Sequence, residues 1–219
     1  MDAPDALTHA PSTLEFWEER YRKDPNAYVF GRAPSPLAQI TLRYWKDLCG
    51  DRAARILDLG CGEGRDAVFF AANGHQVTGV ECAPSGVEKA RRLAAEKGVS
   101  VAIHCTDLRE FPLTPNYEVL FANNSLSALG PECLEYIARL QNATPSGGLN
   151  VLRVHRRECC PPEDRSRLYC FDSNELKFEY RHWRLLYYAE DTLWVSHSIL
   201  ADSEDGKYRS FAEIIAQKP

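Results

Sequence analysis

The chain has 219 residues and a formal net charge of −5 at pH 7, a length typical of one domain with a substantial hydrophobic core. The acidic balance and the lack of a sustained basic stripe argue against nucleic acid as the main partner, so we expect a small molecule instead. No apolar run approaches the roughly 18 residues that cross a membrane, and we expect no membrane partner.

The first 11 residues are rich in proline and acidic residues, and we expect them to be disordered. They lack the basic and apolar regions of a secretory signal. We therefore expect a cytoplasmic protein whose eight cysteines are reduced thiols rather than a disulfide framework. The cysteines do not have zinc-binding spacing, and we predict no metal site.

Two helices are predicted before the first strand. Ser12 and Glu15 form a capping box that begins a helix over about residues 13–23. Ser35, followed by proline, begins a second helix that ends near residue 48. Aromatic residues gather in the first helix and the loop after it, so we expect residues 12–50 to form a helical lid that excludes water from a site. The alternative is that these side chains are only the apolar face of a packing helix.

Residues 51–155 alternate between strands and helices. This alternation predicts a parallel sheet with right-handed crossovers. The predicted strands lie near residues 54–60, 75–81, 100–105, 117–122 and 148–155, and the predicted helices near 64–73, 85–97 and 131–143.

The pattern changes over residues 156–219, which we expect to lie on the substrate side of the domain. A capping box at residues 172–175 predicts a short helix, and a turn at residues 203–206 predicts a hairpin. Strand-like segments cover residues 183–188, 193–200 and 208–216.

The run Asp58-Leu59-Gly60-Cys61-Gly62-Glu63-Gly64 joins a buried strand to a helix. Glycines at alternate positions permit a tight turn of bare backbone, against which a flat polar cofactor can lie. The pattern differs from the dinucleotide fingerprint G-x-G-x-x-G, and Asp58 and Glu63 would repel a pyrophosphate. These acids suit S-adenosylmethionine, which carries an ammonium group and no phosphate. A nicotinamide cofactor is the alternative.

Glu81 ends the second core strand, where an acid accepts hydrogen bonds from both hydroxyls of a ribose. The sequence therefore contains, in this order, a strand, a glycine turn, a helix, a second strand and an acid. A nucleoside site requires this order.

These motifs resemble those of class I S-adenosylmethionine-dependent methyltransferases. The resemblance implies that Glu81 holds the ribose, that Asp107 meets the adenine and that Asp58 lies near the methionine end. It also implies a single Rossmann-like α/β domain over residues 12–219, with a mostly parallel seven-stranded sheet, antiparallel C-terminal strands and helices on both faces. The cofactor-binding residues expected on this basis are Asp58, Gly60, Cys61, Gly62, Gly64, Arg65, Glu81, Cys82, Asp107, Leu108, Asn123, Trp17, Tyr21 and Tyr28.

The opening pattern W-x-x-R-Y … Y-x-F-G-x-x-P-S-P, which begins at Trp17, resembles tellurite-resistance-type methyltransferases. Gly64-Arg65-Asp66 and Phe171-x-x-x-Glu175-Leu176 share this resemblance. The segment from Gly74 to Glu81 is also similar to thiopurine methyltransferases.

Three residues are candidate catalytic residues: Arg153, His155 and His197. Strand alternation points Arg153 and His155 to the same face. They belong to a basic cluster that favours an anionic substrate and also contains Arg156, Arg157, Arg165 and Arg167. The alternative is a solvated loop face balanced by nearby acids. His197 is implied by the resemblance to tellurite-type relatives, although Ser198 follows it where those relatives have a basic residue. A structural histidine is the alternative.

We therefore expect a methyltransferase that converts S-adenosylmethionine to S-adenosylhomocysteine and acts, as a monomer or weak homodimer, on a small chalcogen or thiol acceptor. N- or O-methylation of a small metabolite is an alternative that would use a general base or a polar cage. A non-catalytic S-adenosylmethionine-binding regulatory protein is an alternative of another class. A site that binds a metalloid through Cys105, Cys159, Cys160 and Cys170 is also open.

Overall fold

The computed structural model describes residues 12–160, 165, 167–195 and 207–219. Its strands are β1 (Arg55–Leu59), β2 (Gln76–Glu81), β3 (Ala102–Cys105), β4 (Val119–Asn123), β5 (Leu149–His155), β6 (Arg184–Val195) and β7 (Lys207–Gln217). Its helices are α1 (Thr13–Lys23), α2 (Pro36–Cys49), α3 (Arg65–Ala72), α4 (Pro84–Glu96), α5 (Cys133–Ala143) and α6 (Glu175–Glu179), with 3-10 helices η1 (Leu126–Glu132) and η2 (Arg157–Cys159).

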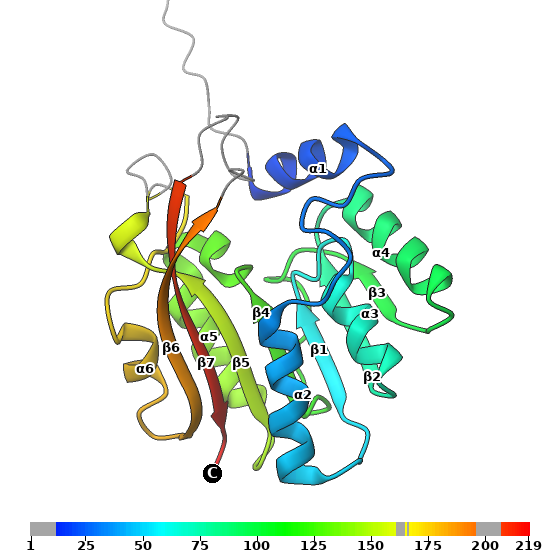
Figure 1. Cartoon of the computed structure of the whole chain (residues 1–219). Coiled ribbons are helices and arrows are strands. Elements are labelled where there is room, and N and C mark those ends of the chain that lie inside the picture. Colours follow the sequence, from blue (N-terminus) through cyan, green and yellow to red (C-terminus); the bar gives the residue numbers. More distant parts are fainter. Residues whose placement is uncertain (1–11, 161–164, 166, 196–206) are drawn as a thin grey trace, which may run out of the picture.

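The strands form one seven-stranded sheet in the order β3-β2-β1-β4-β5-β7-β6 (Figure 1). Strands β1 to β5 pair in parallel, and β7 pairs antiparallel with both β5 and β6. The predicted Rossmann-like sheet with an antiparallel C-terminal strand is therefore confirmed.

Helices cover both faces of the sheet because each core strand presents apolar side chains on alternate sides. In β1, Ile56 packs in the cluster that contains residues of α2, α3 and α4, and Leu57 packs in the cluster that contains residues of α5 and α6. The carboxyl ends of β1 to β5 meet at one edge, and α1 lies across this edge (Figure 1).

The two N-terminal helices begin where the sequence predicts. The Ser12 hydroxyl accepts from the Glu15 amide (3.2 Å), and the Glu15 carboxylate accepts from the Ser12 amide (2.8 Å). Ser35 caps α2 by accepting from the Ala38 amide. The capping box satisfies two otherwise unpaired amides and so stabilises the first turn of α1. The Glu18 carboxylate holds α1 against α4 by accepting from the Ser85 amide (2.9 Å) and hydroxyl (2.7 Å).

The C-terminal part differs from the prediction in two ways. Residues 172–175 do not form a full capping box. Helix α6 begins after Asn174, which has a φ of 61° and no side-chain cap. One half of the predicted box is present, because the Glu175 carboxylate accepts from the Asp172 amide. The two segments predicted at 183–188 and 193–200 are one strand over residues 184–195, because β7 pairs along its whole length from Gln217 to Lys207. The predicted turn at 203–206 and the predicted disordered residues 1–11 lie outside the described residues.

Cys160 and Cys170 form a disulfide, which contradicts the expectation that all eight cysteines are reduced. Five further cysteines of the described ranges are free thiols. Over the same ranges, no helix is long and apolar enough to cross a membrane. Nor do His, Cys, Asp and Glu side chains gather there in a group that could hold a metal ion.

Candidate functional site

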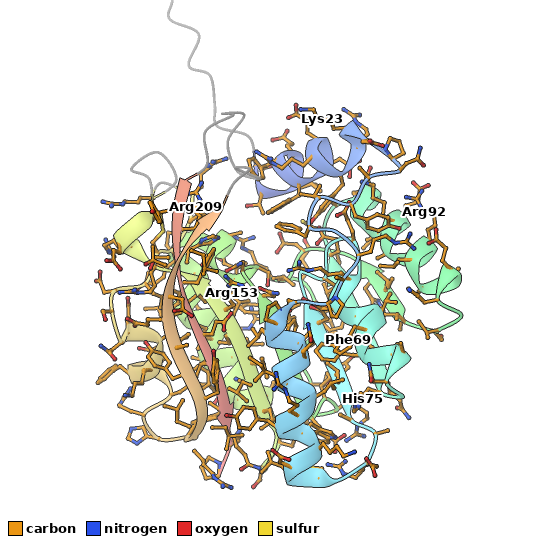
Figure 2. All side chains as sticks on the ribbon, viewed as in Figure 1. Lys23, Phe69, His75, Arg92, Arg153 and Arg209 are labelled. Carbon is orange, nitrogen blue, oxygen red and sulfur yellow. A yellow bond between two sulfur atoms is a disulfide. The ribbon has the colours of Figure 1, made fainter. Side chains whose placement is uncertain are left out.

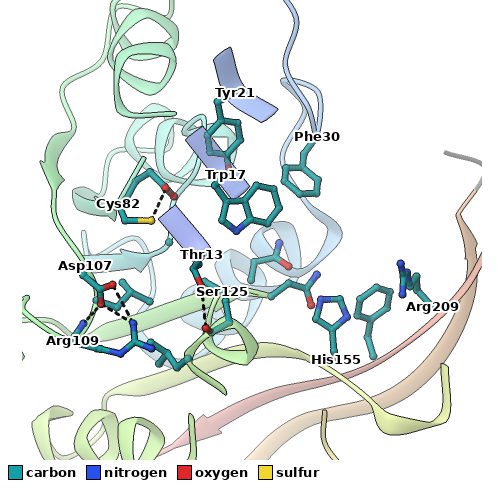
Figure 3. Close-up of a pocket in the computed structure, with 18 residues that line it drawn as sticks. Thr13, Trp17, Tyr21, Phe30, Cys82, Asp107, Arg109, Ser125, His155 and Arg209 are labelled. Atoms are coloured by element: carbon teal, nitrogen blue, oxygen red, sulfur yellow. Dashed lines mark hydrogen bonds and ion pairs between the residues drawn. The ribbon is translucent and has the colours of Figure 1, made fainter. Parts of the chain in front are cut away.

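Two adjoining cavities lie at the carboxyl ends of the central strands. The cavity bordered by both Glu81 and Asp107, which we call the main cavity, has a volume of about 190 Å³, and its walls also include Gly60 and His155 (Figure 3). The side cavity, of about 70 Å³, is bordered by the glycine turn and Asp58. Tyr21, Phe30, Gly60, Asn123 and Asn124 border both cavities. This edge, where strand order reverses direction between β1 and β4, is where open α/β sheets bind ligands.

The glycine turn leaves no room for side chains. Gly60 has a φ of 72°, and a Cβ atom there would lie 2.3 Å from the Ser125 Cβ. Gly62 has a φ of 54°, and its Cβ would lie 2.8 Å from the Tyr21 hydroxyl oxygen. Both glycines border the side cavity, so a ligand there meets bare backbone, as the sequence predicts. Gly64 borders neither cavity and packs instead against Ala90.

Glu81 is 5% exposed and borders the main cavity. Its carboxylate accepts from the amides of Gly62 (3.0 Å) and Ala83 (2.9 Å). Burial raises the pKa of Glu81, and these amides oppose the rise. The two bonds orient the carboxylate at the end of β2, beside Cys82, which also borders the main cavity.

Asp58, Asn123 and Asn124 carry three buried oxygen atoms with no hydrogen-bond partner: Asp58 Oδ2, Asn123 Oδ1 and Asn124 Oδ1. All three residues border the side cavity. Burial raises the pKa of Asp58 well above its usual value, with a further contribution from Asp66. Because buried acceptors almost always have donors, this oxygen cluster fits a group with several N–H donors, such as an ammonium.

Glu63 does not contribute to this cluster as the sequence suggested. Its carboxylate forms an ion pair with the Lys89 ammonium (2.8 Å) and accepts from the Val29 amide (2.6 Å). Lys89 also donates to the Ala27 carbonyl (2.7 Å). The charge of Glu63 therefore holds the loop after α1 onto the glycine turn. Asp66 also borders the side cavity, but both of its carboxylate oxygens accept hydrogen bonds, whereas Asp58 Oδ2 has no partner.

Asp107 borders the end of the main cavity next to Cys82 (Figure 3), and Leu108 also borders this cavity. Arg109 contacts the Asp107 carboxylate at 3.1 Å and the Glu132 carboxylate at 3.0 Å. Arg109 was not among the predicted site residues. It fixes the position of Asp107, the acid expected at the adenine.

The predicted aromatic residues of the N-terminal segment separate into two groups. Trp17 and Tyr21 border the main cavity, and their rings stack with centroids 5.5 Å apart. Phe30, 5.8 Å from Trp17, completes this wall. Tyr28 was predicted at the cofactor but borders neither cavity; its hydroxyl donates to the Lys89 carbonyl, and its ring lies beneath Arg92.

His155 and Arg209 border the opposite end of the main cavity from Asp107 (Figure 3). The His155 ring lies 5.2 Å from the Phe211 ring, which borders the cavity beside it. Burial, together with the charges of Arg209 and Arg153, lowers the pKa of His155 to about 4. His155 is therefore a neutral imidazole at pH 7.

Arg153 borders neither cavity, contrary to its predicted place beside the substrate. Its guanidinium lies 4.0 Å from the centroid of the Phe211 ring and 3.5 Å from the Glu213 carboxylate. It is lower on the sheet than Arg209, which lies near the upper end of β7 (Figure 2). Arg153 therefore packs against the Phe211 ring of the cavity wall without bordering the cavity itself.

The other members of the predicted basic cluster mostly have acidic or backbone partners, as the solvated-loop alternative proposed. Arg156 pairs with Glu158 (3.0 Å) and Glu190 (3.2 Å), and Arg157 pairs with Asp172 (2.8 Å). His197, the third candidate catalytic residue, lies outside the described residues.

Sequence reasoning missed Arg209 and Phe211 as site residues. They reach the cavity because β7 pairs antiparallel with β5, which places Phe211 opposite His155. Asn124 and Ser125 lie at the carboxyl end of β4, the sheet edge at which the strand order predicts ligands, and Asn124 has a positive φ of 63° there. The other unpredicted wall residues are Thr13, Ala128 and Leu129.

The family model of the tellurite resistance protein TehB matches residues 51–206. The chain belongs to the TehB family. This confirms the family predicted from the glycine turn and the N-terminal pattern.

Relatives of this TehB-family chain include a probable S-adenosyl-L-methionine-dependent methyltransferase TehB of Haemophilus influenzae, 24% identical over 63% of the chain and 48% of the relative. A 2-heptyl-1-hydroxyquinolin-4(1H)-one methyltransferase of Mycobacteroides abscessus is 29% identical over 68% of the chain and 67% of the relative. The chain spans about half the length of several curated relatives that it matches, the Haemophilus TehB among them.

The crystal structure of TehB from Haemophilus influenzae superposes with a TM-score of 0.71 at 19% identity, over 93% of this chain and 67% of that one. This similarity shows a shared fold.

Proposed function

We propose that the chain is an S-adenosylmethionine-dependent methyltransferase that acts on a small molecule. The observation that carries the proposal is the cluster of three unpartnered buried oxygens on Asp58, Asn123 and Asn124 beside a glycine turn of bare backbone. A zwitterionic cofactor end with an ammonium group supplies the donors that these oxygens lack.

The cavity walls offer a place for each part of this cofactor. Asp58, Asn123 and Asn124 hold the amino-acid end at the side cavity. Glu81 accepts from the ribose hydroxyls, and Asp107 with Leu108 holds the adenine. Cys61, Gly62 and Arg65 border the side cavity and complete the contacts with the amino-acid end. When bound, the cofactor supplies a methyl group on a sulfonium sulfur that a nucleophile can displace.

We propose a thiol or chalcogen as the methyl-accepting atom. Soft nucleophiles of this kind are anions or are easily ionised, and they need little help from a base. This suits a cavity in which His155 is a weak base because burial and two arginines lower its pKa to about 4. Trp17, Tyr21 and Phe30 exclude water from the reacting atoms and hold the acceptor in line with the methyl group.

O-methylation is the second candidate. The Mycobacteroides relative is named for a 1-hydroxyquinolinone, a compound that carries an acidic hydroxyl. Such a hydroxyl ionises without a strong base, so it suits the same cavity.

Isothermal titration with S-adenosylmethionine tests the cofactor site. We expect binding by the wild-type chain and loss of at least about tenfold in affinity in Asp58→Asn and Glu81→Ala, since each removes a carboxyl oxygen that accepts hydrogen bonds from the cofactor. Glu135→Ala is the matched control, because Glu135 is an exposed carboxylate on α5. Unchanged affinity in both site variants would overturn the assignment.

Release of S-adenosylhomocysteine in the presence of thiols, selenite, tellurite, hydroxyquinolines and amines tests the reaction. Methylation of the sulfur or chalcogen compounds supports the first candidate, and methylation of the hydroxyquinolines alone supports the second. Cofactor binding without turnover of any of these acceptors would favour a regulatory cofactor-binding protein.

A further inference from the structure

A third cavity, of about 300 Å³, adjoins the main cavity on the side of α1 and η1. Trp17 and His155, both labelled in Figure 3, are among the residues that border both cavities. The acids assigned to the cofactor, Asp58, Glu81 and Asp107, do not border the third cavity. A molecule bound beside the cofactor can therefore extend from the main cavity into this space.

The walls that belong to the third cavity and not to the main cavity include three apolar side chains. Phe16 lies on α1, Pro131 on η1 and Leu168 in the segment that leads to α6. The Phe16 ring packs edge-on against the Trp17 ring, with centroids 5.3 Å apart, and so joins these walls to the aromatic wall of the main cavity. Burial of methylene groups against such surfaces is favourable, so this space suits an apolar chain.

The charged side chains around the third cavity have partners within the protein. Arg109 and Glu132 both border it and pair with each other at 3.0 Å. The Arg167 guanidinium lies 5.1 Å from the centroid of the Phe16 ring. His155 is uncharged at pH 7, because burial and two nearby arginines lower its pKa to about 4. Among the described residues that border this cavity, the charges are therefore arranged to contact one another or a ring, which favours an uncharged ligand.

The other polar side chains of this wall are also engaged. The Ser12 hydroxyl accepts from the Glu15 amide (3.2 Å), and the Thr13 hydroxyl donates to the Ala128 carbonyl (3.4 Å). Asn124 borders all three cavities, and its unpartnered carbonyl oxygen is assigned to the amino-acid end of the cofactor. The third cavity therefore suits a part of a ligand that has no hydrogen-bonding group of its own.

We propose that the third cavity binds an uncharged alkyl chain of the methyl acceptor, and that the acceptor is a thiol or hydroxyl compound that carries such a chain. The proposal rests on the proposed methyltransferase function and names the chemical class of its acceptor. An alkyl chain gains free energy when it leaves water for the surfaces of Phe16 and Leu168. A small inorganic oxyanion has no apolar part that could fill this space.

Binding of product analogues that cannot react tests the alkyl site. Methyl n-alkyl sulfides already carry the methyl group, and their ethyl, butyl and hexyl members differ in the length of the chain alone. With S-adenosylhomocysteine bound, we expect the affinity in isothermal titration to rise about threefold to fourfold for each methylene group that enters the cavity. Equal affinity across the series, or no binding of the hexyl compound, would overturn the proposal.

Leu168→Asp places a carboxylate in the apolar wall and should remove the dependence on chain length. We expect the hexyl compound to lose at least about tenfold in affinity and the ethyl compound to change little, because an unpaired charge is costly to bury beside an alkyl chain. Leu168→Met keeps the surface apolar and should retain the wild-type affinities. An affinity that still rises with chain length in Leu168→Asp would overturn the proposal.

Leu14→Asp is the matched control, because Leu14 is an exposed leucine of α1 (45%) that borders none of the three cavities. It should leave the affinity of every sulfide unchanged. The affinity for S-adenosylhomocysteine should also be unchanged in Leu168→Asp, which shows that this variant keeps a folded cofactor site.

Kinetics with ethanethiol, butanethiol and hexanethiol separate this proposal from the function on which it rests. We expect kcat/KM to rise with chain length in the wild type and in Leu14→Asp, and to be independent of chain length in Leu168→Asp. Methylation of the three thiols with equal kcat/KM, or of selenite or tellurite alone, would overturn the alkyl site and leave the methyltransferase function intact. Failure to bind S-adenosylmethionine at all would instead overturn the proposed function.

Discussion

The hydroxyl oxygen of Tyr21 lies 2.8 Å from the position that a Cβ atom on Gly62 would occupy. Helix α1 and the glycine turn are therefore packed against each other at the cofactor site, with no space for even one more carbon. Tyr21 is also in close contact with the Cβ position of Gly86 on α4. The N-terminal helix is thus part of the wall of the candidate site.

We expect Gly62→Ala to weaken both stability and cofactor affinity. Its φ of 54° strains an L-residue by about 1–2 kcal/mol, and the new methyl group meets the Tyr21 hydroxyl. Thermal unfolding and titration with S-adenosylmethionine measure the two effects. Gly147→Ala is the control, since its φ is 77° but nothing lies within 4 Å of its Cβ position.

The contact itself can be separated from the strain. Removing the hydroxyl with Tyr21→Phe should recover part of the affinity that Gly62→Ala loses, so the two changes should be non-additive. Additive effects in the double variant would show that the contact between Tyr21 and Gly62 has no energetic role.

We expect Lys89→Met to destabilise the protein by about 3–5 kcal/mol in urea unfolding, because it leaves Glu63 buried without its partner. The two side chains are 4% and 3% exposed. The double variant with Glu63→Gln should recover much of this loss. The exposed pair Lys46–Asp51 is the control, and Lys46→Met should change stability by less than about 1 kcal/mol. A small effect of Lys89→Met would contradict the role of this pair in holding the loop after α1.

The Glu63–Lys89 pair also shows which features of the site can be predicted from the sequence and which cannot. The strand, turn and helix around Glu63 could be predicted because periodicity and capping are local properties of the chain. The partner of Glu63 could not be predicted, since Lys89 is 26 positions away on α4. Arg209 and Phe211 escaped prediction for the same reason: their place in the cavity depends on the antiparallel register of β7 against β5.

Reduction of the Cys160–Cys170 disulfide should lower the free energy of unfolding by about 3 kcal/mol, as expected for a cross-link spanning 10 residues. Urea unfolding with and without dithiothreitol measures this difference. Cys160→Ser should reproduce the effect of the reductant and abolish further sensitivity to it. Cys105→Ser is the control, because Cys105 is an exposed free thiol. If the wild-type chain unfolds identically in both conditions, the bond does not stabilise the fold.

We expect the free energy of unfolding to decrease as the pH falls from about 6.5 to about 4, because His155 takes up a proton in this range when the chain unfolds. Its pKa is lowered from 6.5 to about 4 by burial and by the charges of Arg209 and Arg153, so the unfolded chain binds a proton there that the folded chain does not. At about 1.4 kcal/mol per pH unit, this histidine contributes about 3 kcal/mol above pH 6.5, and the contribution disappears as pH falls to about 4.

Other groups titrate in the same range, so the measurement is the difference in urea unfolding between wild type and His155→Gln at each pH. We expect that difference to grow as pH rises from about 4 to about 6.5 and to stay constant above it. A flat difference for His155→Gln would mean that this imidazole is not held neutral in the folded chain.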